Sequence, residues 1–175
     1  MRSQTRRSWL LAGKWTVYTL LLLLANTLQT LPALQLFGLK PVFILPLCLA
    51  VALLEGEFSG ALFGAVGGLL WDLSAGRTVG LLGLSLLCLC FLISVLFQIY
   101  LRNTPLNYAI LGSLASLVVL SMDYLYFYVM PGYSGAMQRY LTHILPLVPL
   151  CGLVCLLFRQ ILVLVRKKLD PDERD

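Results

Sequence analysis

The sequence predicts an all-α integral membrane protein with six transmembrane helices. Of its 175 residues, 59% are hydrophobic and only 12% are charged, and the mean hydropathy is +0.88. Soluble domains carry about 25% charged residues, so this composition excludes a soluble globular domain, a disordered chain and a nucleic-acid-binding protein. The few charged residues separate long uncharged runs of the length that membrane spans require.

The charged residues mark the helix ends, because about 20 residues cross a hydrocarbon core of roughly 30 Å. The first, fourth, fifth and sixth expected helices each contain an uncharged run long enough to span the bilayer. The six expected helices cover residues 15–32, 38–54, 58–74, 79–101, 105–130 and 141–165.

The second and third expected helices are short. The second reaches a workable length only if it begins near Phe37 and the Lys40 side chain extends outward to the interface. Pro41 suits its first turn, and Pro46 is expected to kink it one turn later. In the alternative, residues 41–54 and 58–71 form a re-entrant hairpin, but two spans are favoured because a hairpin places Glu55 and Glu57 near the bilayer midplane, where unpaired charges are costly.

The basic residues predict the orientation. They gather at the two ends of the chain, as Arg2, Arg6, Arg7, Lys14, Arg159, Arg166, Lys167, Lys168 and Arg174. Because cytoplasmic segments are enriched in Lys and Arg, we expect both termini in the cytoplasm, which requires an even number of spans. The expected organisation is a basic cytoplasmic arm (1–14), a six-helix transmembrane domain (15–165) and a charged cytoplasmic tail (166–175).

No catalytic, metal-binding or cofactor-binding pattern is recognisable in the sequence. The five cysteines all fall within hydrophobic segments, without the spacing of a zinc site. The single histidine, His143, has no carboxylate or cysteine beside it in the sequence to form a catalytic group. We therefore expect a protein that is not an enzyme and has no cofactor.

The most regular pattern is a glycine at every fourth residue, namely Gly56, Gly60, Gly64 and Gly68. Residues four apart lie on one face of a helix, and small residues let another helix backbone approach closely in lipid. The stripe is expected to pack a helix, either within the bundle or from a partner protein.

A second group of candidate residues is expected on the outer side of the membrane: Asp72, Arg77, Asp123 and Arg139. Two carboxylates within hydrophobic segments require partners, so pairing of Asp72 with Arg77 or Arg139 is the favoured interpretation. A solute or proton site is the alternative. The tyrosines that follow Asp123 predict an aromatic belt at the same interface.

The residues from Gly60 to Asp72, followed by Gly80 and Leu81, resemble the rod shape-determining protein family MreD. The family pattern is a helix of small residues that ends in Gly-Leu-x-x-Asp before a short turn, and Gly68, Leu69 and Asp72 match it. Gly80 also matches, whereas Val79 stands where leucine is usual. The entry to the second helix, Leu36-Phe37-Gly38-Leu39-Lys40-Pro41, is similar to that of the family as well.

The resemblance implies a non-enzymatic scaffold of the bacterial cell-elongation machinery in the inner membrane. It implies pairing with the single-span protein MreC, and a link between MreB filaments and the peptidoglycan-synthesising enzymes. Direct contact with MreB and self-association stay open. The family is also similar in architecture to the substrate-binding subunits of energy-coupling-factor vitamin transporters, so a small-molecule transporter subunit is the alternative function.

Overall fold

The computed structural model describes residues 2–31, 42–76, 80–100, 104–132 and 136–169. All regular elements among these residues are helices, which confirms the all-α prediction. They are α1 (Arg2–Thr30), α2 (Ile44–Glu55), α3 (Glu57–Ala75), α4 (Leu81–Tyr100), α5 (Pro105–Tyr124), α6 (Ala136–Arg139) and α7 (Leu145–Leu169). The π-helical turn η1 (Leu125–Val129) continues α5, and η2 (Tyr140–Ile144) joins α6 to α7, so the described residues form six continuous helices.

Five of these six continuous helices are long and apolar enough to cross a membrane. The exception is α2, which has 12 residues and is therefore about 18 Å long at the α-helical rise. This is shorter than a hydrocarbon core of roughly 30 Å. The expectation of a full-length span is thus met by every helix but the second.

The start of α2 differs from the prediction. Residues 38–41 lie outside the described residues, and the helix begins at Ile44. Pro46 consequently lies in the first turn, where its missing N–H costs no helical hydrogen bond, so the kink predicted there is wrong. The free amides at this helix start are bound by α1, because Gln29 Oε1 accepts hydrogen bonds from the N–H groups of Phe43 and Ile44 at 3.1 and 3.2 Å.

The short helix α2 forms the centre of the bundle. Every residue from Ile44 to Leu53 is buried, and the helix packs against α1, α3, α4, α5 and α7. Its sequence is apolar on all sides, which is typical of a helix enclosed by other helices. The interior of the domain is therefore filled by the chain itself.

The outward faces of the surrounding helices are apolar. Large exposed side chains occur on each of them, including Leu20, Leu62, Leu92, Leu114 and Leu157. Such a continuous apolar exterior is unusual for a protein surrounded by water and suits contact with lipid chains. Together with the five candidate spans, it supports a membrane location.

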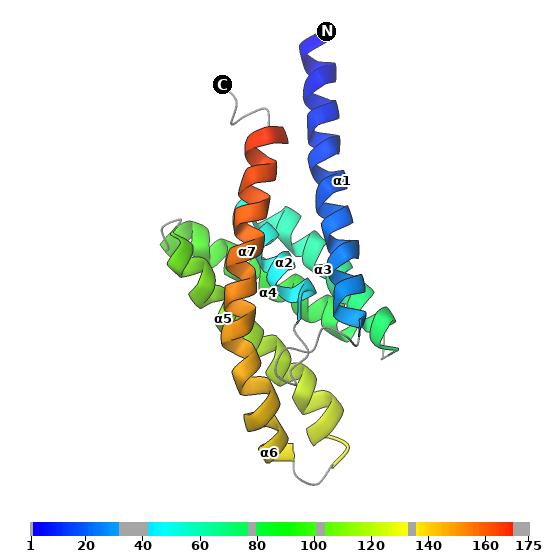
Figure 1. The fold of residues 1–175 in the computed structure, drawn as a ribbon, viewed down its shortest axis with the longest axis vertical. Coiled ribbons are helices and arrows are strands. Elements are labelled where there is room, and N and C mark those ends of the chain that lie inside the picture. The colour runs from blue at the N-terminus through cyan, green and yellow to red at the C-terminus, as the bar shows by residue number, and fades with distance from the viewer. Residues whose placement is uncertain (1, 32–41, 77–79, 101–103, 133–135, 170–175) are drawn as a thin grey trace.

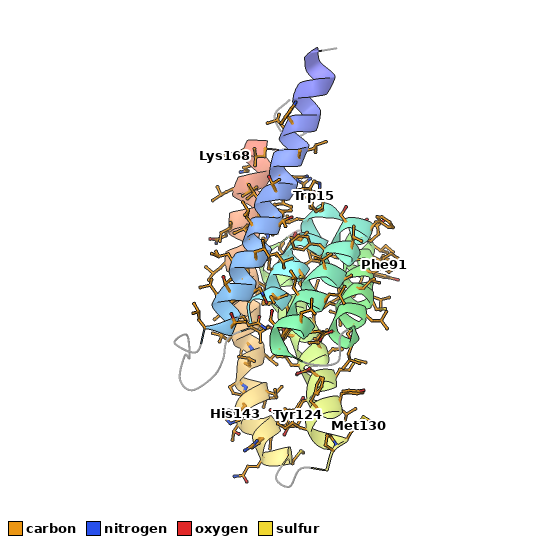
Figure 2. All side chains as sticks on the ribbon, turned by 90° about the vertical axis from the view of Figure 1, so that its right-hand side faces the viewer. Trp15, Phe91, Tyr124, Met130, His143 and Lys168 are labelled. Atoms are coloured by element: carbon orange, nitrogen blue, oxygen red, sulfur yellow. The ribbon has the colours of Figure 1, made fainter. Side chains whose placement is uncertain are left out.

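The start of α1 and the end of α7 lie at the same end of the molecule, which we call the terminal end (Figure 1). At the opposite, distal end, the hairpin formed by α5–η1 and α6–η2–α7 extends beyond α2, α3 and α4 (Figure 1). Figure 2 shows Lys168 and Trp15 toward the terminal end, and Tyr124, Met130 and His143 in the distal hairpin.

Candidate functional site

The glycine stripe on α3 faces the chain's own helices. A Cβ atom added at Gly60 would collide with the backbone of Ala52 in α2. At Gly64 it would lie 2.9 Å from the Sγ atom of Cys90 in α4, and at Gly68 it would lie 2.5 Å from the carbonyl oxygen of Leu82. These glycines let α3 pack directly against α2 on one side and α4 on the other, as small residues do in membrane bundles.

Gly56 has a different role from the other three. It connects α2 to α3 with φ of 94°, a backbone conformation that favours glycine. The stripe thus consists of one turn residue and three packing residues. The helices that pack on it are α2 and α4 of the same chain, which leaves no room there for a partner helix.

Asp72 caps the next helix. Its side chain is fully buried, and Oδ2 accepts hydrogen bonds from the N–H groups of Gly80 at 2.8 Å and Leu82 at 3.2 Å. These amides belong to the start of α4, where orphan N–H groups and the helix dipole favour a carboxylate. The Gly-Leu-x-x-Asp pattern therefore has a local explanation, since Gly68 brings α4 close to α3 and Asp72 binds its first turn.

The structure does not bring Asp72, Asp123 and Arg139, the described members of the predicted outer group, together as one cluster. Arg77 lies outside the described residues. Among the described residues, Asp72 forms neither an ion pair nor a hydrogen bond with Asp123 or Arg139. Asp123 and Arg139 belong instead to the distal hairpin, on α5 and α6 respectively.

The distal hairpin contains a polar pocket, which we call the distal pocket. It has a volume of about 410 Å³ and is lined by Tyr124, Tyr128, Arg139, His143 and Ile144. One wall is a stacked pair of rings, since the centroids of Tyr124 and Tyr128 lie 4.8 Å apart and their planes differ by 9°. The cationic and imidazole side chains come from the opposite helix of the hairpin.

Contacts between tyrosines and a serine hold the two helices of the hairpin together beside this pocket. The Tyr140 ring lies 5.5 Å from that of Tyr124, and the hydroxyl groups of Tyr140 and Ser121 are 2.6 Å apart. The predicted aromatic belt is thus also a packing element of the hairpin.

A second polar group, which the sequence analysis missed, lies at the end of α2 nearer the terminal end. Lys14 Nζ forms an ion pair with Glu55 Oε2 at 2.7 Å, and the Tyr18 hydroxyl donates to Glu55 Oε1 at 2.8 Å. Lys14 is only 4% exposed, although we expected it in a cytoplasmic arm. The sequence signal for this pair is that Lys14 and Glu55 each border a long uncharged run.

Side chains from three further helices bind the last carbonyl groups of α2. The donors are Ser94 of α4 to Ala52 O at 2.8 Å, Tyr108 of α5 to Leu53 O at 3.3 Å, and Arg166 of α7 to Leu54 O at 2.9 Å. Carbonyls at a helix end lack helical partners, and the helix dipole there favours a cation. This α2-end group, together with the Lys14–Glu55 pair, joins α1, α4, α5 and α7 to the central helix.

The cysteines give no indication of a site. All five are free thiols, and four of them are buried. Among the described residues, no three His, Cys, Asp or Glu side chains are placed to hold a metal ion.

Comparison with protein families identifies the chain. A family model described as rod shape-determining protein MreD matches residues 11–167. The chain belongs to the MreD family. The match begins within α1 and ends in the last turn of α7, and so includes the α3–α4 contact, the α2-end group and the distal pocket. Comparison with curated proteins and with solved structures gives no match.

Membership of the MreD family assigns this protein to rod shape determination and links it to the cell-shape machinery and the membrane. The family is one of shape-determining membrane proteins, in agreement with the apolar helices of the structure.

Proposed function

We propose that this MreD protein is a non-enzymatic membrane scaffold of the cell-elongation machinery. In this proposal it pairs with a single-span MreC-like protein and helps to organise peptidoglycan synthesis in the bacterial inner membrane. The observation that carries the proposal is the family match together with the filled interior, since α2 is buried along its length. Partners then bind to the exterior of the bundle.

We further propose that both termini are cytoplasmic. The start of α1 and the end of α7 share one end of the molecule (Figure 1), as an even number of passes requires. The last turn of α7 carries Arg166, Lys167 and Lys168, which is typical of the cytoplasmic side. A reporter fused to either end should then be active only if it functions in the cytoplasm.

The partner helix requires a surface other than the glycine stripe, because that stripe is covered by α2 and α4. A groove of about 600 Å³ runs between α5 and α7 on the exterior. It is lined by small and aliphatic side chains: Ala109, Ile110, Ser113, Leu114, Leu117, Val148, Pro149, Gly152 and Leu153. Small residues in such a groove allow a single helix to approach and gain packing contacts in lipid, so we assign the MreC-like partner to it.

Filling the groove tests this assignment. The double variant Ala109→Phe with Val148→Phe places two rings in the groove and should reduce co-purification of a co-expressed MreC-like protein. Leu92→Phe is the matched control, because Leu92 is 65% exposed on α4, away from the groove, and should leave co-purification unchanged. Equal recovery of partner by the groove variant and the wild type, at equal membrane levels, would exclude this groove as the interface.

The alternative function is a substrate-binding subunit of a vitamin-type transporter. It would imply a fold similar to the substrate-binding subunits of energy-coupling-factor transporters. The polar distal pocket is the observation in its favour. This alternative predicts that a small organic molecule other than a phospholipid stays bound to the gently purified protein, whereas the scaffold predicts no such molecule. Native mass spectrometry distinguishes the two.

A further inference from the structure

The distal pocket combines side chains that the scaffold function does not use. Arg139 and His143 are exposed and lie one helical turn apart, at the junction of α6 with η2, so they project from the same side of the helix. Neither side chain forms a hydrogen bond or ion pair with another residue of the described chain. Both line the same polar space as the Tyr124 and Tyr128 rings.

The lining residues favour an anion. Arg139 carries a permanent positive charge and a planar set of N–H donors that matches the oxygens of a phosphate. His143 adds a ring nitrogen donor, and Ile144 is apolar. The nearest acidic residue in the hairpin sequence, Asp123, is not part of the pocket lining. Among the described residues, the pocket lining therefore consists of one arginine, one histidine, two tyrosines and one isoleucine, and contains no carboxylate.

The position of the pocket favours a ligand at the depth of lipid headgroups. The two candidate spans that form the hairpin are Pro105–Val129 and Met137–Leu169, so the pocket lies near their connected ends. Figure 2 shows Tyr124 and His143 at the same level, one on each helix of the hairpin, with Met130 farther toward the tip. Tyrosine and arginine at this depth are also common as simple interfacial anchors, which is the interpretation that a test must exclude.

The helices on both sides of the pocket depart from regular α-helix. The π-helical turn η1 contains Tyr128, and η2 contains His143 and Ile144. Single π-helical turns inside helices are uncommon and occur frequently at functional sites. Here the two π-helical turns supply three of the five described lining residues, so the irregular helix geometry is concentrated around the pocket.

We propose that the distal pocket binds a phosphate group, held by Arg139 and His143 against the tyrosine wall. The shared chemistry is that of a phosphate ester or phosphate ion, and its source is either the headgroup of an anionic phospholipid or a free phosphate. This site is separate from the α5–α7 groove assigned to the partner helix, so either assignment can fail without the other.

The test uses the full-length protein in detergent, titrated by native mass spectrometry with three probes. The probes are dioctanoyl phosphatidylglycerol, dioctanoylglycerol without phosphate, and inorganic phosphate. We expect one phosphatidylglycerol to bind tightly and dioctanoylglycerol to bind far more weakly. If inorganic phosphate fails to displace the lipid, the ligand is a lipid headgroup; if it displaces the lipid, the ligand is a free phosphate. Both results support phosphate recognition.

Variants connect this binding to the pocket. Arg139→Gln should weaken phosphatidylglycerol binding at least about tenfold, as expected for losing a hydrogen bond to a charged group. Arg139→Lys, which keeps the charge but not the planar fork, should fall between it and the wild type. Lys168→Gln is the matched control, because it removes the same charge at the terminal end (Figure 2) and should leave this binding unchanged.

Two results would overturn the proposal. One is equal binding of dioctanoylglycerol and phosphatidylglycerol, which would make the contact purely apolar. The other is wild-type affinity in Arg139→Gln, which would make Arg139 an interfacial anchor. Because Arg139 is exposed and forms no hydrogen bond to other described side chains, its replacement should leave folding intact, and circular dichroism checks this.

Discussion

Replacing Glu55 by glutamine should destabilise the bundle, because the buried positive charge of Lys14 then loses the carboxylate that neutralises it. The two side chains are 9% and 5% exposed, and their charged atoms lie 2.7 Å apart. Glutamine keeps the shape of glutamate but cannot neutralise the buried ammonium group, and Tyr18 loses a charged acceptor. Removing one partner of a buried ion pair costs about 3–5 kcal/mol, so we expect a loss of about 3 kcal/mol in the free energy of unfolding.

The assay is unfolding of the purified protein in mixed micelles of increasing SDS content, followed by circular dichroism. The double variant Lys14→Met with Glu55→Gln removes the stranded charge as well and should regain at least half of the loss, because a buried pair can be replaced by apolar groups at little cost. Glu57→Gln is the chemical control, since Glu57 accepts its hydrogen bond from Gln98 at an exposed position and should matter much less.

The reasoning would be refuted if Glu55→Gln unfolded at the same SDS content as the wild type. It would also be refuted if the double variant were as unstable as the sum of the two single variants, because a double-mutant cycle without coupling excludes a direct interaction.

Substitutions at two further positions, Gly68 and Asp72, probe the α3–α4 contact by the same assay. Gly68→Ala places a methyl group 2.5 Å from the carbonyl oxygen of Leu82 and should lower the free energy of unfolding by about 1–3 kcal/mol through overpacking. Gly13→Ala is the control, because the nearest atom is 3.8 Å away, and it should be neutral or stabilising. Equal effects of the two variants would contradict this packing. Asp72→Ala should lower the free energy of unfolding by about 2 kcal/mol because it leaves buried amides at the start of α4 without an acceptor. Asp72→Asn keeps one acceptor oxygen and should lose less stability. Identical losses in the two variants would argue against the cap.

The sequence predicts most helices well because hydropathy and charge spacing are local properties. The expected helices 58–74 and 79–101 correspond to Glu57–Ala75 and Leu81–Tyr100. The second helix is different, since its start depends on Gln29, a residue of another helix that binds its first amides. A prediction that placed Pro41 in the first turn could not include this contact.

The polar residues were harder to interpret for a related reason. The sequence analysis favours Arg77 or Arg139 as the partner of Asp72. Arg77 lies outside the described residues, and the described partners of Asp72 are backbone amides at the start of the following helix, which leave no mark in side-chain composition. Lys14 and Glu55 both signalled helix ends, yet their pairing joins residues 41 positions apart in the chain. The depth at which a charge lies is partly predictable from sequence, whereas its partner depends on how the helices pack.

The glycine stripe likewise shows that residue spacing predicts a packing face but does not identify the helix that packs on it. Its periodicity predicts close helix packing at Gly60, Gly64 and Gly68, but the periodicity is the same for an internal and an external helix. The structure supplies the missing information, because α2 and α4 lie against that face.

The most direct test of the scaffold proposal is photo-crosslinking in living cells from single positions on the bundle. A photoreactive residue at Leu114, in the α5–α7 groove, should crosslink to a single-span MreC-like protein, whereas one at Leu92 on α4, which is 65% exposed, should crosslink mainly to lipid. Partner crosslinks from Leu92 but none from Leu114 would contradict the assigned surface. The absence of a partner from every exposed position on the bundle would contradict the scaffold itself.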